Sequence, residues 1–257
     1  MTSQIAVELQ GAGTPVVLIH GLGGTSNVFG PQVAELVKWC QCVRPDLPGS
    51  GRSPSGGSLT IRGLGQAVLA TLDDHRISSA HFIGHSLGAL ICQHIAVNVP
   101  DRVLSLVLVG PMSAPPDPAR AALRARAAKA REHGMVGIAD AITQVALAEH
   151  SRLHRPEVVA FVRELLMRQN PEDYARTCEA LADATSVNLA EIRCPTLLIV
   201  GDGDLSTPPS AVRQLARELR GAELCELARC GHWATLEDPG AVTTAMESFL
   251  KERSLRG

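Results

Sequence analysis

The segment that most constrains the fold of this chain is residues 80–88, where a short apolar run stops at Gly84-His85-Ser86-Leu87-Gly88. The spacing G-x-S-x-G is typical of a sharp turn between a strand and a helix, because the glycines remove side chains that would collide. Such a turn leaves the serine hydroxyl exposed above a sheet. The motif therefore predicts that Ser86 is a nucleophile, provided that its surroundings supply the partners a nucleophile needs.

Strand and helix patterns alternate on both sides of this turn. Apolar, often β-branched runs predict strands at 5–9, 15–20, 41–45, 80–83, 103–109, 195–200 and 223–227. Helical spacing and capping residues predict helices at 32–39, 60–74, 87–98, 208–219 and 239–251. Such alternation favours parallel strands joined by right-handed crossovers. We therefore expect an α/β fold with a mostly parallel sheet of about seven strands, covered by helices on both faces.

Residues 113–188 break this alternation, since they contain helical patterns and no strand pattern. About four helices are predicted there, at 118–133, 135–150, 156–169 and 171–184. We expect this segment to be a helical cap inserted into a core made of residues 1–112 and 189–257. A roof over the rim of the sheet would exclude water and shape the substrate pocket, so specificity should depend on it.

A serine hydroxyl is a poor nucleophile near neutral pH and needs a histidine base that is oriented by a carboxylate. His232 follows the strand predicted at 223–227, and two aspartates, Asp202 and Asp204, follow the strand predicted at 195–200. The carboxyl ends of parallel strands meet at one edge of a sheet, so these side chains can reach Ser86. The residues alone leave open whether Asp202 or Asp204 is the acid.

Five motifs together make the chain resemble the α/β-hydrolase fold superfamily. They are His20-Gly21, Asp46-x-x-Gly49-x-Gly51-x-Ser53, Gly84-x-Ser86-x-Gly88, Gly201-x-x-Asp204 and Gly231-His232-Trp233. The resemblance implies a catalytic triad of Ser86, Asp204 and His232, in the chain order of that superfamily, and favours Asp204 over Asp202 by its spacing.

The same resemblance implies an oxyanion hole made by the backbone N–H groups of Leu22 and Leu87, which would stabilise negative charge on the attacked carbonyl. Gly23 would let a substrate approach this loop closely. Trp233 and Tyr174 are further candidates for the substrate pocket, with packing in the core as the alternative role of each.

Within the superfamily, the sequence resembles the 3-oxoadipate enol-lactonases in Pro171-Glu172-x-Tyr174-Ala175-x-x-Cys178-x-Ala180 and in Cys194-Pro195-Thr196. This implies a carboxylic-ester hydrolase of lactonase type, acting on a small ester or enol lactone through an acyl-enzyme. Hydrolysis of C–C bonds in ring-cleavage diketones, cofactor-free perhydrolysis, and a catalytically idle ligand-binding fold are the alternatives. Arg124, Arg126 and Arg152 are candidates for binding a substrate carboxylate, and the sequence does not choose among them.

Composition restricts the partners. A formal net charge of −2 with 19% charged residues does not favour nucleic acid, and no run of 18 apolar residues predicts a membrane span. Residues 1–13 lack a signal-peptide pattern, so we expect a cytoplasmic protein. The seven cysteines lack zinc-site spacing, so no metal is expected. A dinucleotide fingerprint at Gly21-x-Gly23-x-x-Ser26 lacks its third glycine, which argues against a bound dinucleotide, and the implied ester hydrolysis needs no cofactor. The oligomeric state stays open.

Overall fold

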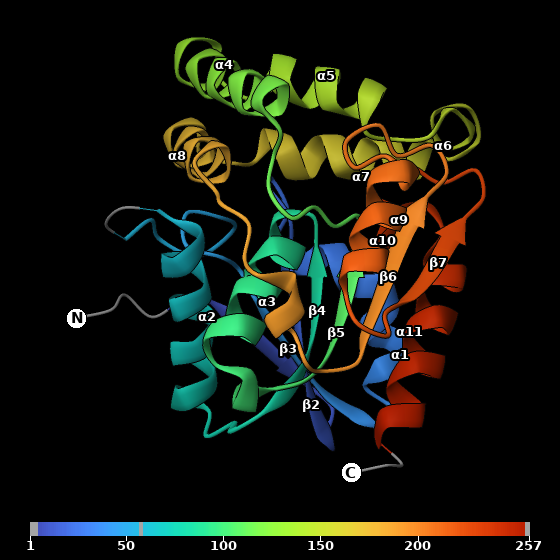
Figure 1. The fold of residues 1–257 in the computed structure, drawn as a ribbon. Helices are drawn as coiled ribbons and strands as arrows, with labels where there is room; N and C mark the ends of the chain where they lie inside the picture. Colours follow the sequence, from blue (N-terminus) through green and yellow to red (C-terminus); the bar gives the residue numbers. More distant parts are fainter. Residues whose placement is uncertain (1–4, 57–58, 255–257) are drawn as a thin grey trace.

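A twisted central sheet runs through the computed structural model, which describes residues 5–56 and 59–254 (Figure 1). Its seven strands in these described ranges are β1 (Val7–Gln10), β2 (Thr14–Ile19), β3 (Cys40–Pro45), β4 (Ala80–His85), β5 (Val103–Val109), β6 (Thr196–Gly201) and β7 (Glu223–Leu227). They lie in the order β1-β3-β2-β4-β5-β6-β7. Only the β1–β3 pair among them is antiparallel. The predicted α/β fold with a mostly parallel sheet is thus confirmed.

Helices cover both faces of this sheet. On one face, α1 (Gly30–Leu36) packs against α11 (Pro239–Ser254), and on the other, α2 (Ile61–Asp74) packs against α3 (Leu87–Asn98) (Figure 1). The helix α9 (Pro209–Glu218) packs against β6 and β7. Within the described ranges, none of the helices has the length and apolarity needed to cross a bilayer.

Thr60 is the N-cap of α2, because its hydroxyl accepts a hydrogen bond from the backbone N–H of Gly63 at 3.0 Å. Short elements complete the core. They are the 3₁₀ turns η1 (Ser26–Phe29), η2 (Pro100–Arg102) and η3 (Leu189–Glu191) and the helix α10 (Ala234–Glu237).

The helices between β5 and β6 lie above the carboxyl ends of the strands (Figure 1). They are α4 (Asp117–His133), α5 (Val136–Val145), α6 (Glu149–His154), α7 (Pro156–Met167) and α8 (Pro171–Ala182). These helices fall inside the segment 113–188 that the sequence predicts as a cap. The core ranges predicted around it also contain residues 1–4, 57–58 and 255–257, which lie outside the described part of the chain.

The segment holds five helices where about four are expected, since the helix predicted over 135–150 is divided into α5 and α6. The division has a tertiary cause. The carbonyl of Ala146 accepts a hydrogen bond from the backbone N–H of His232 at 2.8 Å, and the N–H of Ala148 donates to the Glu237 carboxylate at 2.8 Å. Both backbone groups are therefore bonded to residues of the distant segment 232–237 rather than to the helical ladder.

Candidate active site

Ser86 occupies a strained turn between β4 and α3. Its backbone lies at φ 54° and ψ −113°, a conformation that residues with a side chain rarely adopt. A Cβ atom at Gly84 would lie 2.4 Å from the carbonyl oxygen of Gly88, and one at Gly88 would lie 2.1 Å from that of Ile19. Only glycine fits at both places, so the backbone makes the sharp turn that the motif predicts.

Three of the predicted site residues meet at the carboxyl edge of the sheet. The His232 Nε2 atom lies 2.9 Å from the Ser86 hydroxyl, and its Nδ1 atom lies 2.8 Å from Oδ2 of Asp204. All three side chains are buried. The rival Asp202 is exposed instead, and its Oδ1 accepts a hydrogen bond from the backbone N–H of Cys230 at 3.2 Å. The geometry therefore groups Asp204, and not Asp202, with the serine and the histidine.

The carboxylate of Asp204 is held by donors on both oxygens. The backbone N–H groups of Ser206 and Thr207 donate to Oδ1, each at 2.8 Å, and the Thr207 hydroxyl donates to Oδ2 at 2.7 Å. Burial acts to raise the pKa of Asp204, but the charge and hydrogen bonds of His232 and Thr207 outweigh it, so the pKa is lowered. Asp204 thus stays ionised beside the imidazole.

The pKa of His232 moves in the opposite direction. Burial acts to lower it, but the adjacent Asp204 carboxylate outweighs burial, and the pKa is raised from its ordinary value. Because Asp204 accepts at Nδ1, the proton of the neutral ring lies on Nδ1 and leaves Nε2 free to accept a proton from Ser86. The three groups therefore have the tautomer that general base catalysis requires.

The loop that carries His232 is tied to the neighbouring elements by buried groups. His85 donates from Nε2 to the His232 carbonyl at 2.8 Å. Glu237 accepts from the backbone N–H of Trp233 at 3.0 Å and from the Ser151 hydroxyl at 2.7 Å, and burial raises its pKa. Sequence reasoning missed Glu237, because nothing in its local pattern distinguishes it from a solvated helix residue.

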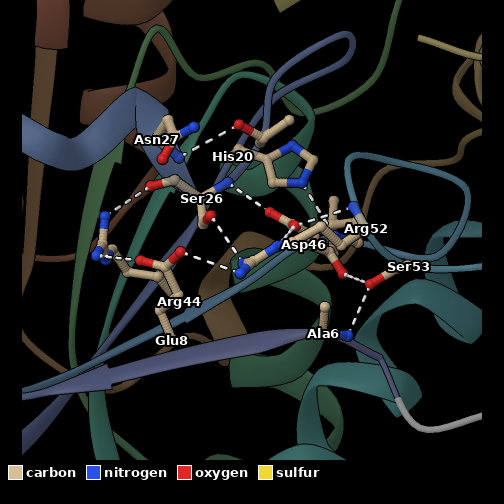
Figure 2. A network of polar contacts seen from close by, with 11 residues as sticks. Ala6, Glu8, His20, Ser26, Asn27, Arg44, Asp46, Arg52 and Ser53 are labelled. Carbon is tan, nitrogen blue, oxygen red and sulfur yellow. Dashed lines mark hydrogen bonds and ion pairs between the residues drawn. The ribbon is translucent and has the colours of Figure 1, made fainter. Parts of the chain in front are cut away.

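A second polar network holds the loop after β2, which carries Leu22 (Figure 2). The backbone N–H of Leu47 donates to Nε2 of His20 at 3.0 Å, so the ring proton lies on Nδ1 and is donated to the carbonyl of Gly21 at 2.8 Å. Burial lowers the pKa of His20, which keeps the ring neutral. This histidine therefore orders the loop through hydrogen bonds of its neutral ring.

Asp46 anchors the same network from the loop after β3. It accepts hydrogen bonds from the backbone N–H of Ser26 and from Nε of Arg52, both at 2.8 Å (Figure 2). The Ser53 hydroxyl donates to the Asp46 carbonyl at 2.6 Å. These contacts connect the loop after β3 to Ser26, the first residue of η1, so the end of the loop that carries Leu22 is fixed before any substrate binds.

The backbone N–H groups of Leu22 and Leu87, the two predicted oxyanion donors, lie at positions where the fold does not require them as hydrogen-bond donors. Leu87 is the first residue of α3, so its N–H has no partner within the helix. Leu22 borders the same cavity as Ser86. Among the described residues, no hydrogen bond engages the N–H of Leu22 or of Leu87. Both groups are thus available to a ligand, and the positive end of α3 adds to the attraction for an anion.

Ser86 and His232 open into a cavity of about 510 Å³, which is large enough for a small organic substrate. Its walls are mostly apolar and come from the loop after β5 and from α4, α5, α8 and α9. Of the three predicted pocket residues, Trp233 lines this cavity, whereas Gly23 and Tyr174 do not. Tyr174 is only 2% exposed and packs beside Gly23, where an added Cβ would lie 3.3 Å from its ring.

Comparisons with known proteins agree with this architecture. A family model described as the alpha/beta hydrolase family matches residues 16–245. The chain is 34% identical over 260 residues to a pimeloyl-[acyl-carrier protein] methyl ester esterase of Chromobacterium violaceum, covering 96% of this chain and 98% of the relative. It is 30% identical over 238 residues to 3-oxoadipate enol-lactonase 2 of Acinetobacter baylyi, and the match covers 92% of this chain and 88% of the relative.

A solved structure gives the same result in three dimensions. The enol-lactonase from Burkholderia xenovorans superposes with a TM-score of 0.91 at 30% identity, covering 96% of each chain. The predicted resemblance to the superfamily and to its enol-lactonases is therefore confirmed. This chain belongs to the alpha/beta hydrolase family.

Proposed function

We propose that this chain is a carboxylic-ester hydrolase, of lactonase or small-ester type, that works through an acyl-enzyme on Ser86. The observation that carries the proposal is the pair of contacts made by His232, 2.9 Å to the Ser86 hydroxyl and 2.8 Å to Asp204, at the floor of a cavity. Both curated relatives described above are named for reactions at an ester bond, which supports this bond type.

In the proposed reaction, the Ser86 oxygen attacks the substrate carbonyl while Nε2 of His232 takes the hydroxyl proton. The carbonyl oxygen becomes an oxyanion, which the N–H groups of Leu22 and Leu87 stabilise. Collapse of this intermediate breaks the C–O bond, and His232 returns the proton to the leaving alcohol. Water then attacks the acyl-enzyme while His232 takes its proton, and a second oxyanion forms at the same donors. Its collapse breaks the bond to the Ser86 oxygen, which receives the proton from His232, and the acid is released while Asp204 keeps His232 oriented.

Covalent labelling tests whether Ser86 is activated. We expect a fluorophosphonate probe to modify Ser86 in the folded protein, because the probe reacts with a serine whose proton is taken by a neighbouring base. Peptide mass mapping would locate the adduct, and Ser113, a second serine on the cavity wall, serves as the internal control. If the probe modified neither serine and the protein hydrolysed no ester, the result would instead support the alternative of a catalytically idle fold that binds a ligand.

A substrate panel separates the reactions that the same triad could serve. In this proposal, residues 113–188 form a cap inserted between core segments 1–112 and 189–257, and its cavity walls select the substrate. Turnover of simple lactones or p-nitrophenyl esters, without cleavage of vinylogous diketones or peroxide-dependent halogenation, is the result that supports the proposal. If the protein cleaved the diketones and left the esters and lactones intact, the proposed function would change to C–C bond hydrolysis.

The pH dependence of hydrolysis should report on His232. The imidazole must be neutral to accept the serine proton, and its pKa is raised, so kcat/KM should fall as the pH drops through a value above the ordinary histidine pKa of about 6.5. Burial lowers the pKa of His85 to about 3, so this neighbouring ring does not titrate in that range. A pH profile of kcat/KM with a neutral ester measures the effect, and a flat profile down to pH 5 contradicts it.

A further inference from the structure

One face of α4 forms part of the cavity wall. Ala119, Ala122, Leu123 and Arg126 line the cavity, and steps of three and four residues place them along one side of the helix. Arg126 is the only lysine or arginine among the lining residues of the described chain, and it is partly buried. A cation therefore borders the apolar space above the Ser86 hydroxyl.

The other arginines of α4 have structural partners on the α8 side of the helix. These bonds are Arg120 Nη2 to the Ala184 carbonyl (2.7 Å), Arg124 Nη2 to Asp183 Oδ1 (2.6 Å) and Arg131 Nε to Glu172 Oε2 (2.7 Å). Arg126 differs, since the described residues offer it no carboxylate within ion-pair distance. The packing of α4 on α8 thus uses three arginines, whereas Arg126 borders both the cavity and the buried Tyr174 hydroxyl of α8.

The charge of Arg126 acts within the site. Burial and Asp204 dominate the pKa of His232, and Arg126 contributes a smaller effect that lowers this pKa. The cavity has one other charged lining residue in the described ranges, Glu218, which is exposed and accepts a hydrogen bond from Gln214 at 3.1 Å. Because Glu218 is exposed and Arg126 is partly buried, solvent screens the charge of Glu218 more strongly than that of the guanidinium.

We propose that Arg126 binds a carboxylate of the substrate, so that the enzyme prefers esters or lactones carrying a free carboxylate over neutral ones. This inference rests on the proposed ester hydrolysis at Ser86. A guanidinium presents paired N–H donors that match a carboxylate, and the mostly apolar lining of the cavity that Arg126 and Ser86 share suits a short hydrocarbon spacer.

The other two arginines that the sequence offers for this role are occupied. Arg124 pairs with Asp183 in solvent, and Arg152 donates to the backbone carbonyls of Gln144 and Leu147 at 2.8 and 2.7 Å. Neither borders the cavity. The structure therefore selects one of three candidates that sequence reasoning could not separate.

The test compares monomethyl esters of linear dicarboxylic acids, from succinate to suberate, with methyl alkanoates of the same carbon number, by methanol release. The readout is the ratio of kcat/KM for the anionic ester to that for its neutral partner. We expect wild type to favour the anionic ester at its best chain length. Losing a charge-assisted bidentate contact in Arg126→Gln should lower the ratio about 10- to 100-fold, mainly through KM.

Two further variants separate binding from structure. Arg126→Lys keeps the charge and should retain part of the preference, whereas Arg124→Gln removes a solvent-exposed arginine two residues away and should keep the wild-type ratio. Thermal unfolding checks that each variant is folded. A ratio that is equal in wild type and Arg126→Gln, or that falls equally in Arg124→Gln, would overturn the inference. If the wild-type protein hydrolysed neither the anionic nor the neutral esters, that result would instead refute the proposed ester hydrolysis itself.

Discussion

Replacing Ser86 with alanine is expected to reduce kcat for ester hydrolysis by about 10⁴- to 10⁶-fold while the protein stays folded. The hydroxyl is the attacking group, so no acyl-enzyme can form without it, and only the residual effect of the oxyanion donors and binding remains. Among the residues that the structure describes, the hydroxyl makes one hydrogen bond, to His232, and His232 keeps its bond to Asp204 when that bond is lost. Alanine also tolerates the backbone at φ 54° as well as serine does, because both residues carry a Cβ.

The measurement compares initial rates of wild type and Ser86→Ala on the best ester of the panel, with thermal unfolding recorded in parallel. Ser113→Ala is the matched control, since Ser113 lines the same cavity and has no role in the proposed chemistry. We expect that control to keep turnover within about threefold of wild type, as for a surface-like substitution. Near-native hydrolysis by Ser86→Ala would mean that another group performs the attack.

The strand–turn–helix unit around Ser86 could be predicted because its determinants are local. Two glycines and an apolar run specify the turn, and the backbone approaches at Gly84 and Gly88 exclude any larger residue. The alternation of strands and helices is also local, and parallel pairing follows from it. Once the strands are parallel, the loops that carry Asp204 and His232 lie at the same edge as Ser86. The topology thus brings the three loops to one edge, and which side chains touch there is given by the contacts of His232.

The division of α5 from α6 could not be predicted in this way. Residues 145–150 contain neither proline nor glycine and read as continuous helix. The hydrogen bond from the His232 N–H to the Ala146 carbonyl ends α5, and it joins residues 86 positions apart. The bond from the Ala148 N–H to the Glu237 carboxylate precedes α6, and it joins residues 89 positions apart. Such contacts are set by tertiary packing, which overrides local helix propensity.

The substrate pocket was predicted only in part for a similar reason. The choice of Arg126 over Arg124 depends on which side of α4 faces the cavity, and the alanine-rich pattern of α4 leaves its rotation undetermined. Tyr174 shows the converse problem. As the only tyrosine it stands out in the sequence, yet α8 buries its ring beside Gly23 and away from the cavity lining.

Replacing Asp204 with asparagine is expected to lower kcat by about 10⁴-fold with little change in KM, because a wrong histidine tautomer results. The N–H groups of Ser206 and Thr207 both donate to Oδ1, so the amide oxygen of the asparagine must occupy that position. The NH₂ group then replaces Oδ2 and donates to Nδ1 of His232. The ring proton is forced onto Nε2, which can no longer accept the proton of Ser86.

Asp202→Asn is the matched control, because this aspartate lies two residues away, differs from Asp204 by its exposure, and was the rival acid in the sequence. Its Oδ1 accepts from the backbone of Cys230, and an asparagine oxygen can accept the same bond. Initial rates across a pH series, together with fluorophosphonate labelling rates at Ser86, measure both variants. Asp202→Asn should behave as wild type within about twofold. If Asp202→Asn lost activity while Asp204→Asn kept it, the orienting carboxylate would have to be reassigned, since the tautomer argument depends on Asp204 alone.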